Sequence, residues 1–143
     1  MDVTADTCVS APNTPDFSVT LTPTPALLFH FSALTYNAHS IHLDPQYCRE
    51  EEGHRDLLVH GPLSLVLMLS VLRSQVSEGT RIQQIDYRNL APLYVREPMR
   101  VCVRKNEKSG SSDGTQNWDV WVENKDGSLS IRATAITGPK KAP

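Results

Sequence analysis

The longest apolar run of the chain predicts one buried helix near its middle. Pro62 to Glu78 reads PLSLVLMLSVLRSQVSE, and its apolar side chains cover most of the circumference that a helix over this segment would have. Proline is favoured in the first turn of a helix, and Gly79 supplies a stop at the other end. Because a helix that is apolar nearly all round is buried on most sides, we expect it at the centre of the fold.

Alternating polar and apolar positions predict about five strands, four of them in succession after the helix. Asp126-Gly127 lies between the last two alternating runs and is a strong hairpin signal. A sheet with one apolar face must cover that face, and the long helix is the only candidate. The expected fold is therefore of the α+β class, with an antiparallel sheet wrapped around one long central helix, which is the hot-dog arrangement. The predicted strands cover residues 16–21, 81–94, 99–104, 118–123 and 129–136.

Two segments before the helix have no clear element type. Ala26 to Tyr36 (ALLFHFSALTY) is apolar and aromatic, and it fits either a strand or a helix. Asn37 to Arg55 is polar and rich in histidine and has no clear periodicity, which predicts a loop or short helical turns. Because functional side chains are often placed on loops, the second segment is where we expect the chemistry.

The length and composition indicate one globular domain. The chain has 143 residues, which fit a single domain, and its mean hydropathy of −0.33 is typical of a soluble protein. Residues 1–15 are rich in Thr, Ser, Asp and Pro. We therefore expect a mobile leader at residues 1–15, one hot-dog domain at residues 16–138 and a short tail at residues 139–143.

Charge, hydropathy and cysteine content exclude several classes of function. The net charge of −2, without a block of like charges, argues against a nucleic-acid partner. No run approaches the ~18 apolar residues that span a bilayer, so no membrane association is expected. The three cysteines are widely spaced and form no CxxC pair, which fits reduced thiols rather than a disulfide framework or zinc knuckle. With no recognisable targeting signal, we expect a cytoplasmic location.

Two motifs resemble one enzyme family. Phe31 to Tyr47 reads FSALTYNAHSIHLDPQY, and Leu58 to Leu69 reads LVHGPLSLVLML. Both resemble the hydroxyacyl-thioester dehydratase type 2 and MaoC-like hydratase family, in a branch with the motifs FSALTxNAHxIHxD and VHGPL. Tyr87 to Tyr94 (YRNLAPLY) fits the same branch, and the resemblance extends from about residue 16 to residue 137. It implies a hot-dog fold and hydro-lyase activity, as a hydratase or dehydratase, on an enoyl or 3-hydroxyacyl thioester.

The resemblance also implies the residues of the site. His42 matches the family's catalytic histidine, and Gly61 matches the glycine whose backbone N–H helps to hold the thioester oxygen. The turn around this glycine leads directly into the predicted helix. The expected catalytic residues are His42, Asn37 and His39, and the expected oxyanion or substrate-binding residues are Gly61, His60 and Leu63.

The chemistry of such a reaction needs a base and an oxyanion site. Addition of water to an enoyl thioester creates an enolate at the carbonyl oxygen, and dehydration passes through the same enolate. A positioned histidine is a suitable base, and free N–H groups at the start of a helix favour the negative oxygen. The scheme requires Gly61 to lie close to His42, and a large separation would exclude it.

Asn37 departs from the commoner family pattern, GDxNPxH, which has its catalytic Asp at this position. An amide cannot take up a proton at neutral pH, so the usual pair of acid and base cannot operate unchanged. Asn37 can still orient water or substrate, while His39, at the Asn position of that pattern, or Asp44 serves as a second titrating group. Asp44 is more readily explained as the cap of a helix that begins at Pro45.

Cofactors, partners and alternative functions complete the prediction. No metal and no cofactor are expected, since CoA or a carrier-protein arm is part of the substrate, and the spacing of the histidines and Cys48 matches no standard ligand pattern. Many longer relatives in the family carry a first, degenerate hot-dog half that this chain lacks, which implies a homodimer. Two alternatives remain open, namely an isomerase or cyclase of polyketide-like secondary metabolism and a non-catalytic thioester-binding subunit.

Overall fold

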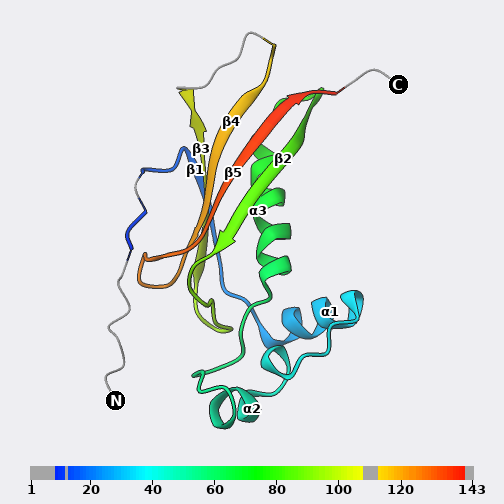
Figure 1. Cartoon of the computed structure of the whole chain (residues 1–143), viewed down its shortest axis with the longest axis vertical. Coiled ribbons are helices and arrows are strands. Elements are labelled where there is room, and N and C mark those ends of the chain that lie inside the picture. The colour runs from blue at the N-terminus through cyan, green and yellow to red at the C-terminus, as the bar shows by residue number, and fades with distance from the viewer. Residues whose placement is uncertain (1–8, 12, 108–112, 141–143) are drawn as a thin grey trace.

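The structure is a computed structural model that describes residues 9–11, 13–107 and 113–140. Figure 1 shows one antiparallel sheet, a long helix along one of its faces, and short helices gathered at one end. The strand order is β1-β3-β4-β5-β2. The elements are β1 (Phe17–Leu21), α1 (Pro25–Thr35), η1 (Ser40–His42), α2 (Pro45–Glu50), α3 (Gly61–Gln75), β2 (Thr80–Asn89), β3 (Met99–Asn106), β4 (Gln116–Glu123) and β5 (Leu129–Pro139).

The apolar face of the sheet packs against α3, as the alternating pattern predicts. Val101, Val120 and Ala133 come from three neighbouring strands and lie in one core cluster with Met68 and Leu72 of the helix. All five side chains are buried, and Met68 and Leu72 are completely inaccessible to solvent. This arrangement confirms the predicted α+β class, in which one long helix covers an antiparallel sheet.

The long helix starts one residue earlier and ends three residues earlier than the predicted range of residues 62–78. It begins at Gly61 and ends at Gln75, followed by Val76 in an extended conformation with ψ of 136°. The stop assigned to Gly79 is therefore wrong. Gly79, with φ of +81°, instead lies in the turn between the helix and β2, where Thr80 N–H donates to the Ser77 carbonyl.

The ambiguous apolar segment before the site forms the helix α1 rather than a strand. Thr24 caps its start by accepting a hydrogen bond from Leu27 N–H, and Pro25 occupies the first turn. Tyr36 ends the helix in the left-handed conformation with φ of +53°. The polar segment that follows contains the short helical turns η1 and α2, in agreement with the prediction.

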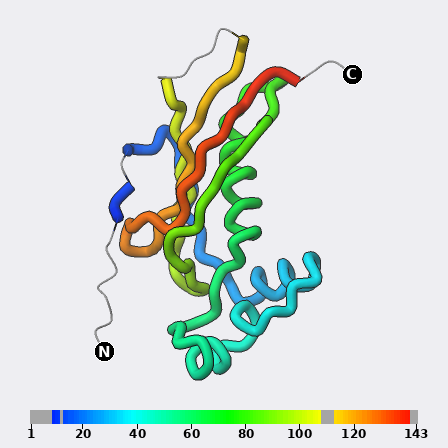
Figure 2. The backbone as a smooth tube through the Cα atoms, viewed as in Figure 1, coloured from blue at the N-terminus to red at the C-terminus, as the bar shows by residue number. Residues whose placement is uncertain are grey.

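Residues 9–11 run across the face of the sheet opposite α3, beside the β4–β5 turn (Figure 2). Ser10 forms an isolated antiparallel bridge with Ser128, and Leu129 N–H donates to the Val9 carbonyl over 2.8 Å. Ala11 packs against the small apolar cluster that contains Trp121. These contacts are at odds with the mobile leader expected from composition, because apolar residues on this face of the sheet give the segment a surface to cover. Residues 1–8 of the expected leader lie outside the described residues.

The two ends of the expected domain differ slightly from the prediction. Strand β5 continues to Pro139, and Lys140 N–H donates to the Gly79 carbonyl over 2.9 Å, so the start of the expected tail is still paired. Residues 141–143 lie outside the described residues. None of the helices in the described ranges is long and apolar enough to cross a membrane.

We expect the substitution Met68→Ala to destabilise the fold strongly. Met68 is fully buried between α3 and the sheet, so its truncation leaves a cavity and lowers the free energy of unfolding by about 2–5 kcal/mol. Urea unfolding monitored by circular dichroism measures this loss. Ser70→Ala, on the exposed side of the same helix, should change the value by less than about 0.5 kcal/mol. Equal losses in the two variants would contradict the central position of the helix.

Candidate active site

The candidate site lies at the N-terminal end of α3, where four segments meet. The end of α1, the turn η1 and residues 57–60 all approach the first turn of the long helix. In Figure 1 these segments form the cyan and teal group below the start of α3. The sequence places most of its histidines in the same stretch, so the fold concentrates them at one end of the molecule.

His42 is held in one orientation by a backbone carbonyl. Its Nδ1 lies 2.7 Å from the carbonyl oxygen of Leu58. Because a carbonyl oxygen can only accept, Nδ1 carries the proton and Nε2 keeps its lone pair. The side chain is only 8% exposed, and burial lowers the pKa of His42 despite this hydrogen bond, with a further lowering by nearby His39. His42 is therefore a neutral imidazole with a basic nitrogen available at neutral pH.

Leu58 fixes this geometry through both of its backbone groups. Its N–H donates to the Ile41 carbonyl over 2.9 Å, while its own carbonyl accepts from His42. The residues on either side of Leu58 bond to another segment, since Val59 N–H donates to Leu93 and Val95 N–H donates to Leu57. An isolated antiparallel bridge between Leu58 and Tyr94 thus ties the segment that holds His42 to the segment after β2.

His60 lies directly against His42. The two imidazole rings are stacked, with centroids 3.6 Å apart and planes inclined by 19°. His60 is fully buried, and its Nε2 lies 2.8 Å from the Ser32 hydroxyl of α1. Burial, followed by the nearby His42, lowers the pKa of His60 to about 4, so this ring stays neutral at physiological pH. Its Nδ1 has no hydrogen-bond partner within the described part of the chain.

Gly61 opens α3 and directly follows His60, the residue whose ring is stacked on His42. The first hydrogen bond in this turn runs from Ser64 N–H to the His60 carbonyl. In the described ranges the N–H groups of Gly61 and Leu63 have no acceptor, and Pro62 has no N–H. These free donors and the helix dipole favour a negatively charged oxygen at this point. The Leu63 side chain is buried in the core, so only its backbone faces this position.

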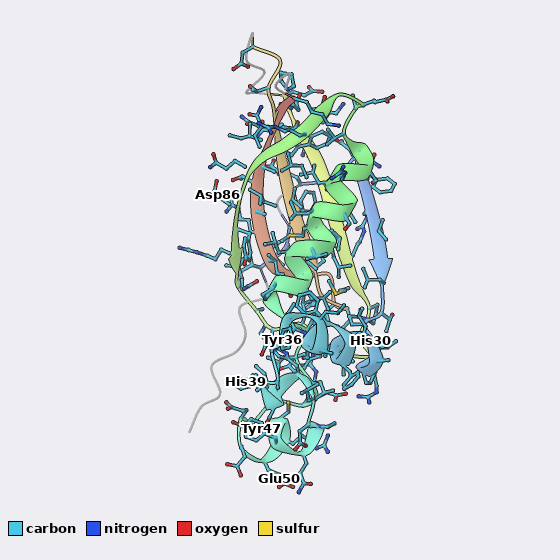
Figure 3. The ribbon with its side chains drawn as sticks, turned by 90° about the vertical axis from the view of Figure 1, so that its right-hand side faces the viewer. His30, Tyr36, His39, Tyr47, Glu50 and Asp86 are labelled. Atoms are coloured by element: carbon cyan, nitrogen blue, oxygen red, sulfur yellow. The ribbon has the colours of Figure 1, made fainter. Side chains whose placement is uncertain are left out.

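Asn37 and His39 come just before His42 and are held by local hydrogen bonds. Asn37 Oδ1 accepts the His39 N–H over 3.2 Å, and His39 Nδ1 accepts the Ile41 N–H over 3.3 Å. His39 is exposed, and its ring centroid lies 6.3 Å from that of His42. Figure 3 shows it at the same end of the molecule as Tyr36 and Tyr47. Since Nδ1 of His39 accepts, its neutral form carries the proton on Nε2.

Asp44 and Cys48 each have a structural role, as a helix cap and as a buried thiol. Asp44 Oδ1 accepts the N–H groups of Gln46 and Tyr47, which confirms the interpretation as a helix cap. Cys48 is buried, its thiol donates to the Ile41 carbonyl, and burial raises its pKa, so it is present as a thiol. Across the residues that the structure describes, no group of three or more His, Cys, Asp or Glu side chains is arranged to hold a metal ion.

Three residues near the site were not singled out from the sequence. Ser32 and Leu58 each bond to one histidine, and Asn89 lies close to Gly61. All three fall inside the motifs quoted for the family resemblance, which is the one signal that could have indicated them. Gly61 and Asn89 also line a pocket of ≈ 320 Å³ with Leu58, Val59, Ser64, Leu90, Ala91, Pro92, Leu93 and Ile131.

Comparison with known proteins decides the family. The family model described as hydroxyacyl-thioester dehydratase type 2 matches residues 3–95, a range that contains every residue of the candidate site. The chain belongs to the hydroxyacyl-thioester dehydratase type 2 family. The motifs at residues 31–47 and 58–69 are therefore motifs of this family, as the resemblance implied.

Individual relatives agree with this membership. A mesaconyl-C(4)-CoA hydratase of Chloroflexus aurantiacus is 38% identical over 95% of this chain and 45% of its own length. A mitochondrial hydroxyacyl-thioester dehydratase type 2 of Schizosaccharomyces pombe is 36% identical over 62% of this chain and 30% of its own length. The chain thus spans less than half the length of these curated relatives.

A solved structure shows the same fold at low sequence identity. The (R)-hydratase from A. caviae involved in PHA biosynthesis is 17% identical to this chain, with a TM-score of 0.76. The match covers 92% of this chain and 100% of that one. This structural similarity confirms that the chain has the hot-dog fold.

Acidification is expected to destabilise the protein through His60. Its pKa falls from 6.5 to about 4 on folding, so between these values the unfolded chain binds a proton that the folded chain does not. The free energy of unfolding should therefore decrease as the pH falls from 6.5 towards 4, by up to about 1.4 kcal/mol per pH unit from this residue. Urea unfolding at a series of pH values measures the slope.

The variant His60→Gln isolates this contribution. It removes the titrating group, so the slope below pH 6.5 should become smaller than in the unchanged protein. His30→Gln is the matched control, because His30 is exposed and its loss should leave the slope unaltered. The same slope in all three proteins would show that His60 is not held neutral by burial.

Proposed function

We propose that this chain is a hydro-lyase that hydrates an enoyl thioester or dehydrates a 3-hydroxyacyl thioester. One observation carries the proposal, namely that His42, whose Nδ1 is bonded and whose Nε2 is free, stacks on His60, the residue directly before the unpaired N–H groups at the start of α3. A base and a site for a negative oxygen are the two devices that the reaction needs. Membership of the family and the printed names of its relatives support the same reaction.

The proposed hydration begins at His42. Its Nε2 takes a proton from water as the water oxygen bonds to the β-carbon, and the double-bond electrons move to the thioester oxygen. The Gly61 N–H and the amino end of α3 stabilise the resulting enolate. A proton then returns to the α-carbon from the Nε2 of His39 in its imidazolium form, which leaves His42 protonated and His39 neutral, and solvent restores both. Dehydration is the reverse sequence.

Asn37 has a positioning role in this scheme. As an amide it moves no proton, but its Oδ1 holds the backbone of His39, an exposed histidine near the base. Asp44 is committed to its helix cap. The presence of His39 within 6.3 Å of His42, measured between ring centroids, favours the hydro-lyase over an isomerase or cyclase that works with a single histidine.

The substrate of the proposed reaction is an acyl thioester of CoA or of a carrier protein. The name of the Chloroflexus aurantiacus relative, a mesaconyl-C(4)-CoA hydratase, supports a CoA thioester. In this scheme the thioester arm belongs to the substrate, and the reaction needs no separate cofactor, because water supplies the only other reactant.

We expect His42→Ala to abolish most of the activity. Loss of the base should lower kcat about 10²–10⁴-fold in an assay that follows the absorbance of the conjugated double bond of crotonyl-CoA. Since burial lowers the pKa of His42, the activity of the unchanged enzyme should decline only below pH 6.5. His30→Ala, at an exposed position on α1, is the control and should retain full activity. Tight binding of crotonyl-CoA without turnover in the unchanged protein would instead support a non-catalytic binding subunit.

We propose in addition that the chain acts as a homodimer. One side of α3 is uncovered, and Val66 there is 48% exposed. An open groove of ≈ 470 Å³ runs between this side and β2, which is an edge strand paired only with β5. An exposed edge and an apolar groove favour association. The groove is lined by Val66, Leu69, Ser70, Arg73, Ile82, Gln83, Gln84 and Ile85.

The substitution Val66→Glu is expected to produce a monomer. A carboxylate in the groove cannot be buried against a second apolar surface without a large desolvation penalty. Light scattering after size exclusion should give twice the chain mass for the unchanged protein and one chain mass for the variant. Thr134→Glu, exposed on the opposite face of the sheet, should remain dimeric. A monomeric unchanged protein would contradict the proposal.

We also propose a cytoplasmic location. Cys48 and Cys102 are buried free thiols, which suits a reducing compartment. Because the Schizosaccharomyces pombe relative is named as mitochondrial, fluorescence of a tagged protein in mitochondria is the result that would overturn this assignment.

A further inference from the structure

The side chain of Asn89 lies over the first residue of α3. A Cβ atom added to Gly61 would be only 2.9 Å from Nδ2 of Asn89, and the three heavy atoms nearest to that position all belong to the Asn89 amide. Asn89 is the last residue of β2, on the face of the strand that is turned towards the helix. The amide of one element therefore fills the space that a side chain on the other would need.

This contact depends on the absence of a side chain at residue 61. Its φ lies outside the left-handed range, unlike that of Gly79 or Gly127, so the backbone conformation does not require glycine. A Cβ at this position would force the Asn89 amide to move away, because a real Cβ is essentially never found within 3.0 Å of another heavy atom. Gly61 also precedes a proline, where a side chain disfavours the helical conformation.

The backbone around Asn89 holds its side chain near this point. Asn89 pairs with Ile131 in the sheet, and the N–H groups of the next two residues, Leu90 and Ala91, both donate to the Ser130 carbonyl. Within the described ranges, the Asn89 amide has no hydrogen-bond partner. An exposed, unpaired amide thus lies against the turn whose backbone N–H groups are also unpaired.

The same amide faces the pocket next to the proposed reaction centre. Asn89, Gly61 and Ser64 contribute to the lining of the ≈ 320 Å³ pocket, whose other walls are mostly apolar. Leu58 lines this pocket too and bonds to His42 through its carbonyl. A thioester placed in the pocket with its oxygen at the Gly61 N–H would therefore have the Asn89 Nδ2 close to that oxygen.

We propose that Asn89 is a further catalytic residue, whose Nδ2–H is a second donor to the thioester oxygen beside the Gly61 N–H. This inference rests on the proposed hydro-lyase function and names a residue that sequence reasoning did not select. Two donors from different elements fix the oxygen in place and stabilise the enolate that forms on it. Gly61 then has two roles. It donates its own N–H, and its lack of a side chain leaves the space that the Asn89 amide occupies.

The experiment compares Asn89→Ala and Asn89→Asp with the unchanged enzyme. Loss of one oxyanion donor lowers kcat about 10²–10³-fold, and we expect a loss of this size with a smaller change in KM. Asn89→Asp has nearly the same shape but presents oxygen atoms instead of an N–H donor, so it should be at least as impaired. Asn13→Asp adds the same charge at an exposed site in the N-terminal segment and should retain full activity.

Gly61→Ala tests the geometric part of the inference. The added methyl should displace the amide and mimic Asn89→Ala, although the Gly61 N–H is retained. The double variant should be little worse than either single variant, because both remove the same donor. Thermal melting establishes that each variant is folded. Losses that multiply in the double variant would overturn the shared role.

A second readout separates failure of the inference from failure of the proposed function. The carbonyl stretching band of bound butyryl-CoA, a saturated thioester that cannot be hydrated, reports hydrogen bonds to its oxygen by infrared difference spectroscopy. We expect the band to move to higher frequency in Asn89→Ala. An unmoved band with unchanged kcat overturns the role of Asn89 while the hydro-lyase stands. An unmoved band in a protein without turnover overturns both.

Discussion

The hydrogen bond from His42 Nδ1 to the Leu58 carbonyl is the constraint on which the site depends. It assigns the proton to one nitrogen and leaves the other free to act as a base. The carbonyl is fixed in turn, because the residues before and after Leu58 are paired with Val95 and Leu93. The orientation of the His42 ring is therefore set by backbone groups of a segment 16 residues away in sequence. A backbone carbonyl cannot be protonated near neutral pH, so this tautomer is stable over the working range.

The stacking of His60 on His42 defines the electrostatics of the site. His60 has no exposed surface and is bonded to Ser32, and its low pKa keeps it uncharged. The His42 imidazole thus rests on a flat neutral surface. A charged neighbour in the same place would hinder the uptake of a proton by His42 far more strongly. Burial of His42 itself lowers its pKa, which keeps the ring unprotonated at neutral pH.

The sequence predicted the elements with strong periodicity and the residues covered by the family resemblance. The long helix and the hairpin at Asp126-Gly127 follow from patterns that depend only on neighbouring residues. The apolar segment of α1 was ambiguous, because period alone does not separate a short buried strand from a helix. The contacts made by Ser32, Leu58 and Asn89 join segments that are distant in sequence, so no local pattern reveals them. The ordered position of residues 9–11 was missed for the same reason.

The capping of the helices indicates where the fold leaves donors free for a ligand. Thr24, His39 and Asp44 each accept a backbone N–H at the start of α1, η1 and α2, whereas His60 makes no such bond at the start of α3. A missing cap costs about 0.5–2 kcal/mol of stability. Burial of Met68 and Leu72 in the same helix offsets that cost several times over, so α3 forms without a cap. Of the four helical elements in the described residues, the uncapped one is the one that begins beside His42, which is where an enolate needs donors that no side chain has taken.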